Sequence, residues 1–147
     1  MTLQIQPTAP ADKNTWYALW KAYLAFYEAE LSDDIYQSTF ERYSDPEVEN
    51  MVSWIAWLDD QPVGLANTII HPDGWRLEPV TYLQDLYVSP IARCKGVARA
   101  LIENIYKDAD EQNRASVYWL TQENNHTAQT LYDRIAKKSD FLVYERE

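Results

Sequence analysis

Three basic side chains gather where a strand-forming stretch leads into a helix-forming one. Residues 80–88 are rich in Tyr, Val and Leu, and the loop after them carries Arg93, Lys95 and Arg99 with no acidic residue between them. The first amides of a helix have no acceptor within the helix and carry a partial positive charge, so they bind phosphate groups. Gly96 allows a phosphate to approach the backbone. The segment therefore predicts a phosphate-binding loop.

Two other interpretations of this loop compete with phosphate binding. In the first, Gly96 only forms a turn and the cations only solvate the start of a helix. In the second, the loop binds a nucleoside triphosphate or a dinucleotide, but the Gly-x-x-x-x-Gly-Lys-Ser/Thr and Gly-x-Gly-x-x-Gly patterns are both absent. The nucleotide interpretation is therefore disfavoured.

Two motifs together resemble those of a known family. The pattern Arg93-x-x-Gly96-x-Ala98, after the strand-forming Asp-Leu-Tyr-Val, resembles the pyrophosphate signature of the GNAT acetyl-CoA-dependent N-acetyltransferases. The pattern Asn125-x-x-Ala128-x-x-Leu131-Tyr132 is similar to the Asn-x-x-Ala-x-x-Leu-Tyr helix of that family. The order and separation of the motifs match the family, and the predicted elements match across nearly the whole chain.

The resemblance implies acetyl-CoA as the cofactor. The amides of residues 94–99 would hold the pyrophosphate, residues 86–88 would pair with the pantetheine arm, and the amide near Leu86 would polarise the thioester carbonyl. Asn125 and Ala128 would contact the pantetheine from the other side. The cofactor-binding residues implied in this way are Leu86, Tyr87, Val88, Arg93, Cys94, Lys95, Gly96, Val97, Ala98, Arg99, Asn125 and Ala128.

The same resemblance assigns catalytic roles. Tyr132 would be the general acid that protonates the departing thiolate after direct attack in a ternary complex; without the family it would be interpreted as a core residue. Spermidine/spermine-type relatives have a glutamate where this chain has Gln84, which cannot take a proton. Asp85 is expected on the opposite face of the strand. A backbone carbonyl, a water relay or Glu123 would then serve as the base.

The acidic character of the first half of the chain bears on the acceptor. Residues 28–60 contain ten acidic side chains and one basic side chain, Arg42. Acidic walls attract cationic amines, although an ordinary acidic surface has the same composition. By resemblance, we expect a small polyamine or diamine to contact Tyr27, Glu28, Asp73, Trp75 and Gln84. Acetylation of protein lysines or free amino acids, or a non-catalytic acyl-CoA sensor, are the alternatives.

Other chemistry has less support. Cys94 lies in an electropositive loop that would activate a thiolate, but no feature of the sequence places His71 or His126 beside it. The residues His71, Asp73 and His126 have no recognised metal-ligand spacing, so no metal is expected.

Composition limits the partners. The 13 basic and 23 acidic residues give a net charge of −10, which disfavours nucleic acid and anionic lipid. No apolar run is long enough for a membrane span, the first twelve residues lack a signal-peptide pattern, and a single cysteine indicates no need for an oxidising compartment, so a cytoplasmic protein is expected. The surplus of tyrosine and tryptophan predicts a homodimer or a higher homo-oligomer.

Hydrophobic periodicity predicts one domain over residues 1–147. We expect strands near residues 3–5 and over 51–58, 63–70, 80–88, 116–120 and 141–144, with helices from a cap at Asp12 through Tyr27 and over 34–43, 96–113 and 125–135. This order indicates an α/β fold. The GNAT resemblance implies a mixed, mostly antiparallel central sheet flanked by helices, with strands that splay apart at the cofactor site.

Overall fold

The computed structural model describes residues 1–147 and contains a five-stranded sheet in the order β1-β2-β3-β4-β5. The first four strands are antiparallel to their neighbours, and β5 is parallel to β4. The expected mixed α/β fold is therefore confirmed. The strands are β1 (Leu3–Pro7), β2 (Met51–Leu58), β3 (Gln61–His71), β4 (Val80–Val88) and β5 (Ser116–Trp119). The helices are α1 (Lys13–Phe26), α2 (Asp33–Ser44), α3 (Val97–Glu111) and α4 (His126–Ile135). Two short 3-10 helices, η1 (Pro10–Asp12) and η2 (Pro90–Ala92), precede α1 and α3.

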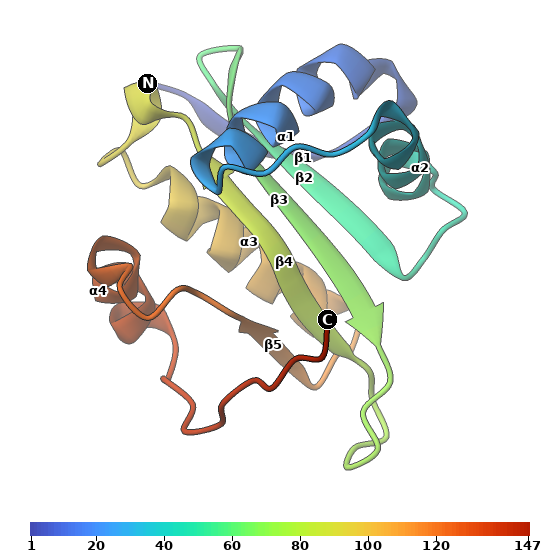
Figure 1. Ribbon diagram of the computed structural model, residues 1–147, viewed down its shortest axis with the longest axis vertical. Helices are drawn as coiled ribbons and strands as arrows, with labels where there is room; N and C mark the ends of the chain where they lie inside the picture. The colour runs from blue at the N-terminus through green and yellow to red at the C-terminus, as the bar shows by residue number, and fades with distance from the viewer.

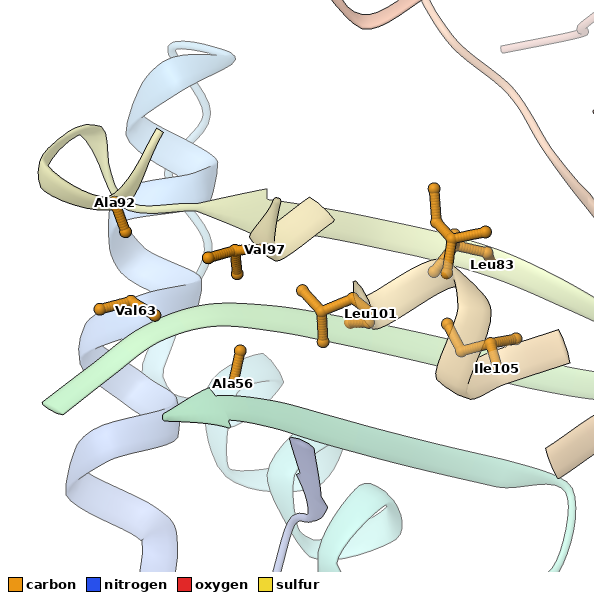
Figure 2. Packing of buried hydrophobic residues seen from close by; sticks show 9 residues of the cluster. Ala56, Val63, Leu83, Ala92, Val97, Leu101 and Ile105 are labelled. Atoms are coloured by element: carbon orange, nitrogen blue, oxygen red, sulfur yellow. The ribbon is translucent and has the colours of Figure 1, made fainter. Parts of the chain in front are cut away.

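The helices cover both faces of this sheet, with α1 and α2 on one side and α3 on the other (Figure 1). Trp16, Trp20 and Phe40 bring α1 and α2 into one buried cluster with the sheet residues Ile55 and Leu65. A second buried cluster forms between α3 and the opposite face of the sheet, where Val97, Leu101 and Ile105 lie over Val63, Ala56 and Leu83 (Figure 2). Burial of each large apolar side chain stabilises the fold by about 1.5–3 kcal/mol.

Local sequence explains where α2 begins and ends. The Ser32 side chain accepts a hydrogen bond from the Ile35 amide, and the helix ends at Ser44, immediately before Asp45-Pro46. At α1 the expected side-chain cap is wrong, because the Asp12 carboxylate accepts from the Ala9 amide at 2.8 Å within η1. That helix also ends one residue before Tyr27.

β4 is paired along its full length on one edge only. It is hydrogen-bonded to β3 from Val80 to Val88, but β5 pairs with it only from Val80 to Leu83. Residues 84–88 therefore have an edge that no strand of the chain covers. This separation of β4 from β5 is the splay that the family resemblance implied.

A β-bulge lies where the two strands separate. On β3, Asn67 is opposite Asp85 and Thr68 is opposite Leu83, so Gln84 is the extra residue. A bulge turns the residues on its two sides toward opposite faces. Leu83 accordingly packs in the cluster under α3, whereas Asp85 contacts α1.

The C-terminal segment differs from the sequence-based expectation. Residues 136–147 form no helix or strand, so the predicted strand over 141–144 is wrong. Its apolar side chains are exposed, from 57% at Val143 to 95% at Tyr144. High β propensity does not form a strand without a paired edge, and no backbone hydrogen bond joins this segment to β5.

We predict that Gly64→Ala lowers the free energy of unfolding. A Cβ at Gly64 would lie 3.1 Å from the Tyr87 carbonyl oxygen and 3.2 Å from side-chain atoms of both Val97 and Leu101. Overpacking of this kind costs about 1–3 kcal/mol. Chemical denaturation measures the change, with Gly74→Ala as the control, because no atom lies within 4 Å of a Cβ there. Equal stability of the two variants would contradict the prediction.

Candidate active site

The predicted phosphate-binding loop connects η2 to α3 at the end of β4. Cys94 and Gly96 have φ angles of 61° and 77°, and Gly96 occupies the position that caps α3. None of the backbone amides from 94 to 99 donates a hydrogen bond within the chain. A Cβ on Gly96 would have no neighbour within 4 Å, so the space in front of the loop is open. Six unpaired amides at a helix start fit the oxygens of a phosphate or pyrophosphate group.

The cations of this loop divide into two groups. Arg93 and Lys95 are exposed beside the unpaired amides and form no ion pair. Arg99 instead directs its guanidinium along α3, where Nε lies 2.7 Å from Glu103 Oε1. Two of the three expected cations are therefore available to an anion at the loop. Cys94 and Ala98 contribute two of the unpaired backbone amides of this loop.

The uncovered edge of β4 lies next to this loop. The Ser89 amide donates to the Val63 carbonyl on β3. Because successive residues of a strand direct their backbone groups to opposite edges, Tyr87 also faces β3, and Leu86 and Val88 face the open edge. Leu86 and Val88 thus each present a free amide and a free carbonyl, whereas the backbone of Tyr87, the third expected cofactor residue of β4, pairs with β3. An extended amide-containing chain would pair with them as a further strand does.

α4 carries the predicted general acid to the side of this opening. The Asn125 side chain caps the helix by accepting from the Ala128 amide at 3.4 Å. One turn later the half-buried Tyr132 ring packs against Trp119, with 5.2 Å between ring centroids. Burial, followed by the nearby Tyr27, raises the pKa of the Tyr132 phenol. The phenol is therefore protonated at neutral pH and can donate a proton.

Tyr27 and Glu28 follow the last turn of α1. Tyr27 is 41% exposed and lies beside Tyr23, with 5.1 Å between ring centroids. Glu28 is exposed and has a φ angle of 54°. Since Tyr27 influences the pKa of Tyr132, α1 and α4 bring these two predicted site residues into one region.

Asp73 and Trp75 lie elsewhere. Their loop joins β3 to β4 at the His71–Val80 pair, whereas the basic loop follows Val88. A strand of this length spans roughly 26 Å at about 3.3 Å per residue. Asp73 contacts Arg76 at 3.8 Å, and Trp75 is 92% exposed. The structure does not bring this pair together with Tyr27 and Glu28.

The same distance along the sheet separates Cys94 from His71. The His71 ring is engaged by the Tyr118 hydroxyl at 2.7 Å, and Cys94 is exposed in the basic loop. A Cys94–His71 nucleophilic pair is therefore wrong. No group of three His, Cys, Asp or Glu side chains is placed to hold a metal ion. None of the helices has the length and apolar character needed to cross a membrane.

The structure adds Asp85 to the candidate site. Gln84 is exposed at the bulge, but the next side chain, Asp85, is half-buried between β4 and α1. Its Oδ2 accepts hydrogen bonds from Asn67 Nδ2 at 3.0 Å and Trp20 Nε1 at 3.3 Å. Burial raises the pKa of this carboxyl. The signal in the sequence was a lone carboxylate within an apolar strand beside the position where a base was sought.

Comparisons with known proteins agree with this geometry. Residues 16–136 match the Acetyltransferase (GNAT) family. The chain is 38% identical over 146 residues to the D-amino-acid N-acetyltransferase HPA3 of Saccharomyces cerevisiae, an alignment that covers 97% of this chain and 89% of the relative.

Solved structures share the fold at low sequence identity. The aminoglycoside acetyltransferase AAC(6')-Iy, in complex with a CoA-based bisubstrate analogue, has a TM-score of 0.86 at 20% identity and covers 100% of this chain and 99% of its own. The ribosomal-protein-alanine N-acetyltransferase of Brucella melitensis has a TM-score of 0.84 at 20% identity, with coverage of 100% and 99%.

The family match includes both motifs and nearly all of the elements that form the site. Acetyl-CoA is the acetyl donor of this family, and the unpaired amides at 94–99 and the open edge of β4 fit its pyrophosphate and its amide-containing arm. The chain therefore belongs to the GNAT family of acetyltransferases and is an acetyl-CoA-dependent N-acetyltransferase.

Proposed function

We propose that this N-acetyltransferase acetylates the amino group of a free amino acid, by direct attack of the amine on the thioester in a ternary complex. The observation that carries the proposal is the 38% identical relative, which acts on D-amino acids and aligns with nearly the whole chain. A small amine also suits an acceptor region in which Tyr27 and Glu28 are exposed at the end of α1.

A cationic polyamine or diamine is the second candidate. Glu28 stands next to Tyr27 at the end of α1, and residues 28–60 remain strongly acidic. Against this candidate, Asp73 and Trp75, the expected second wall of the cleft, lie near the opposite end of β4. One acidic wall attracts any cationic amine and does not distinguish a polyamine from a basic amino acid.

The proposed roles of individual residues follow the geometry. The amides from Cys94 to Arg99, with Arg93 and Lys95, would hold the pyrophosphate. The free backbone groups of Leu86 and Val88 would orient the pantetheine arm, and the Leu86 amide would stabilise the developing oxyanion. Asn125 and Ala128 would contact the same arm from α4. Tyr132 would hold on its Oη the proton that the leaving thiolate takes. Gln84 would contact the acceptor amine without taking its proton.

Further expectations about the chain remain predictions. A homodimer or higher homo-oligomer is supported by the exposed apolar side chains over residues 141–144, because such surfaces are commonly covered by a partner. A cytoplasmic location and the lack of a nucleic-acid or membrane partner rest on the net charge of −10 and the cysteine count.

We predict that Arg93→Ala combined with Lys95→Ala weakens acetyl-CoA binding. Loss of two cations beside the unpaired amides removes about 1.4 kcal/mol, or about tenfold in Kd. Isothermal titration measures this change, and Lys13→Ala with Lys107→Ala is the control, since both lysines are exposed elsewhere and the charge change is equal. An equal loss of acetyl-CoA affinity in both double variants would contradict the prediction, because the effect would then depend on net charge alone.

We predict that Tyr132→Phe lowers kcat while leaving the acetyl-CoA Kd nearly unchanged. The phenyl ring keeps the contact with Trp119 but has no proton to donate, and general acid catalysis contributes about 10²–10⁴-fold. Thiol release under saturating acetyl-CoA measures the effect, with Tyr144→Phe as the control because that ring is 95% exposed. An unchanged kcat would remove the acid role of Tyr132.

We predict that a panel of D- and L-amino acids gives higher kcat/KM than spermidine or a histone-tail peptide. Each amine is supplied with acetyl-CoA, and thiol release and the acetylated product are both quantified. Preferred turnover of spermidine would favour the second candidate. Acetyl-CoA binding without release for every amine would support a sensor and overturn the proposed function.

A further inference from the structure

The amine substrate must lose a proton before it attacks, because amines are protonated near neutral pH. Gln84 has no basic atom, and Glu123 is exposed in the loop after β5. The carboxylate that lies within β4 itself is Asp85. The bulge at Gln84 turns this side chain toward α1, the helix that ends immediately before Tyr27.

The surroundings of Asp85 hold its carboxylate in one orientation. Asn67 and Trp20 both donate to Oδ2, so that oxygen is committed to the fold. Asn67 is itself fixed, because its Oδ1 accepts from Ser53 Oγ at 2.7 Å and from Trp16 Nε1 at 3.3 Å. The network is buried and does not reach solvent through these donors.

Two tyrosines of α1 connect Asp85 to the opening. Burial raises the pKa of the Tyr23 hydroxyl, and the nearby Asp85 carboxylate and Tyr27 raise it further. The rings of Tyr23 and Tyr27 are in edge contact at 5.1 Å, and Tyr23 also packs against Tyr87 of β4 at 6.5 Å. Tyr27 is partly exposed, so the order Tyr27, Tyr23, Asp85 leads from the surface to a half-buried acceptor.

We propose that Asp85 is the final acceptor of the substrate's amine proton, which reaches it through the hydroxyls of Tyr27 and Tyr23. This inference rests on the proposed acetyl transfer and deepens it. The ammonium N–H bond breaks as its proton binds Tyr27 Oη, the Tyr27 proton moves to Tyr23 Oη, and the Tyr23 proton moves to Asp85. The products are a neutral amine, two neutral tyrosines and a neutral carboxylic acid, so charge and protons balance.

The groups that face Asp85 suit this role. The titratable groups among them are tyrosines: Tyr23 on α1, Tyr43 on α2 and Tyr82 on β4. Asp85 belongs to none of the four ion pairs, so no cation lowers its proton affinity through direct contact. Burial raises the pKa of Asp85, which makes it a stronger base than an exposed carboxylate.

The test uses Asp85→Asn, Tyr23→Phe and, as the control, Tyr17→Phe, which lies on α1 against Tyr36 and Phe40. An asparagine keeps an oxygen for Asn67 and Trp20 and an amide group for the Tyr23 hydroxyl, but it cannot take the proton. We expect kcat for the preferred amine to fall about 100-fold or more in Asp85→Asn and Tyr23→Phe, with the acetyl-CoA Kd within about twofold. Tyr17→Phe should retain wild-type kcat.

Two pH-dependent readouts separate proton transfer from a structural role. In the wild type, kcat/KM should rise as Asp85 ionises, and this acid limb should be absent in Asp85→Asn. Because the pKa of Asp85 is raised on folding, wild-type stability should fall as pH increases from the ordinary aspartate range through the raised value. The Tm of Asp85→Asn relative to wild type should therefore rise over the same interval.

Several results would overturn the proposal. Wild-type kcat in Asp85→Asn or Tyr23→Phe would exclude the relay, as would a reduced kcat that keeps the acid limb in Asp85→Asn. A Tm difference that does not change with pH would exclude a carboxyl with raised proton affinity. If the wild type binds acetyl-CoA but releases no thiol with any amine, the proposed acetyl transfer fails first, and the inference fails with it.

Discussion

The site depends on the early end of the β4–β5 pairing. Four residue pairs join the two strands, and β4 then continues for five residues with β3 as its only partner. Backbone groups buried without partners are costly, so an edge of this kind must face solvent or a bound molecule. The α3 helix begins directly after this edge, which places its unpaired amides in line with the free backbone groups of Leu86 and Val88. One long arm ending in phosphates can therefore satisfy both sets of groups.

The β-bulge in β4 gives the two neighbouring residues Gln84 and Asp85 different surroundings. It leaves Gln84 exposed near the splay and directs Asp85 under α1. In the cluster of Trp16, Trp20 and neighbouring aromatic rings on that face, the two indole N–H groups donate to Asn67 and Asp85. Indoles can bury a large apolar area and still donate one hydrogen bond, which explains their use above a half-buried carboxylate. The aromatic surplus of the chain is partly explained by this cluster.

Local patterns predicted the elements and both cofactor motifs, because helix periodicity, turn residues and the position of Gly96 act over a few neighbours. Three features depend on distant pairing and were missed. The bulge changes the face of Asp85 against strict alternation, the segment after Ile135 has strand-forming residues but no paired edge, and the loop carrying Asp73 lies at the far end of β4. Each is decided by the register between strands, which a single sequence does not encode in its spacing.

The proposed acid and the proposed base have raised pKa values for the same reason but with opposite consequences. Burial disfavours the charged form of each group. For Tyr132 this keeps the phenol protonated and ready to donate, whereas for Asp85 it increases the affinity of the carboxylate for a proton. Tyr27 lies between these roles, since it contributes to the raised pKa of Tyr132 and its ring contacts that of Tyr23. The first ammonium proton passes to Asp85 on the α1 side, while Tyr132 on the α4 side gives its proton to the thiolate and regains one from the second N–H of the acetylated nitrogen. The site would then end neutral overall, with Asp85 protonated and Tyr132 restored, as a poorly solvated site requires.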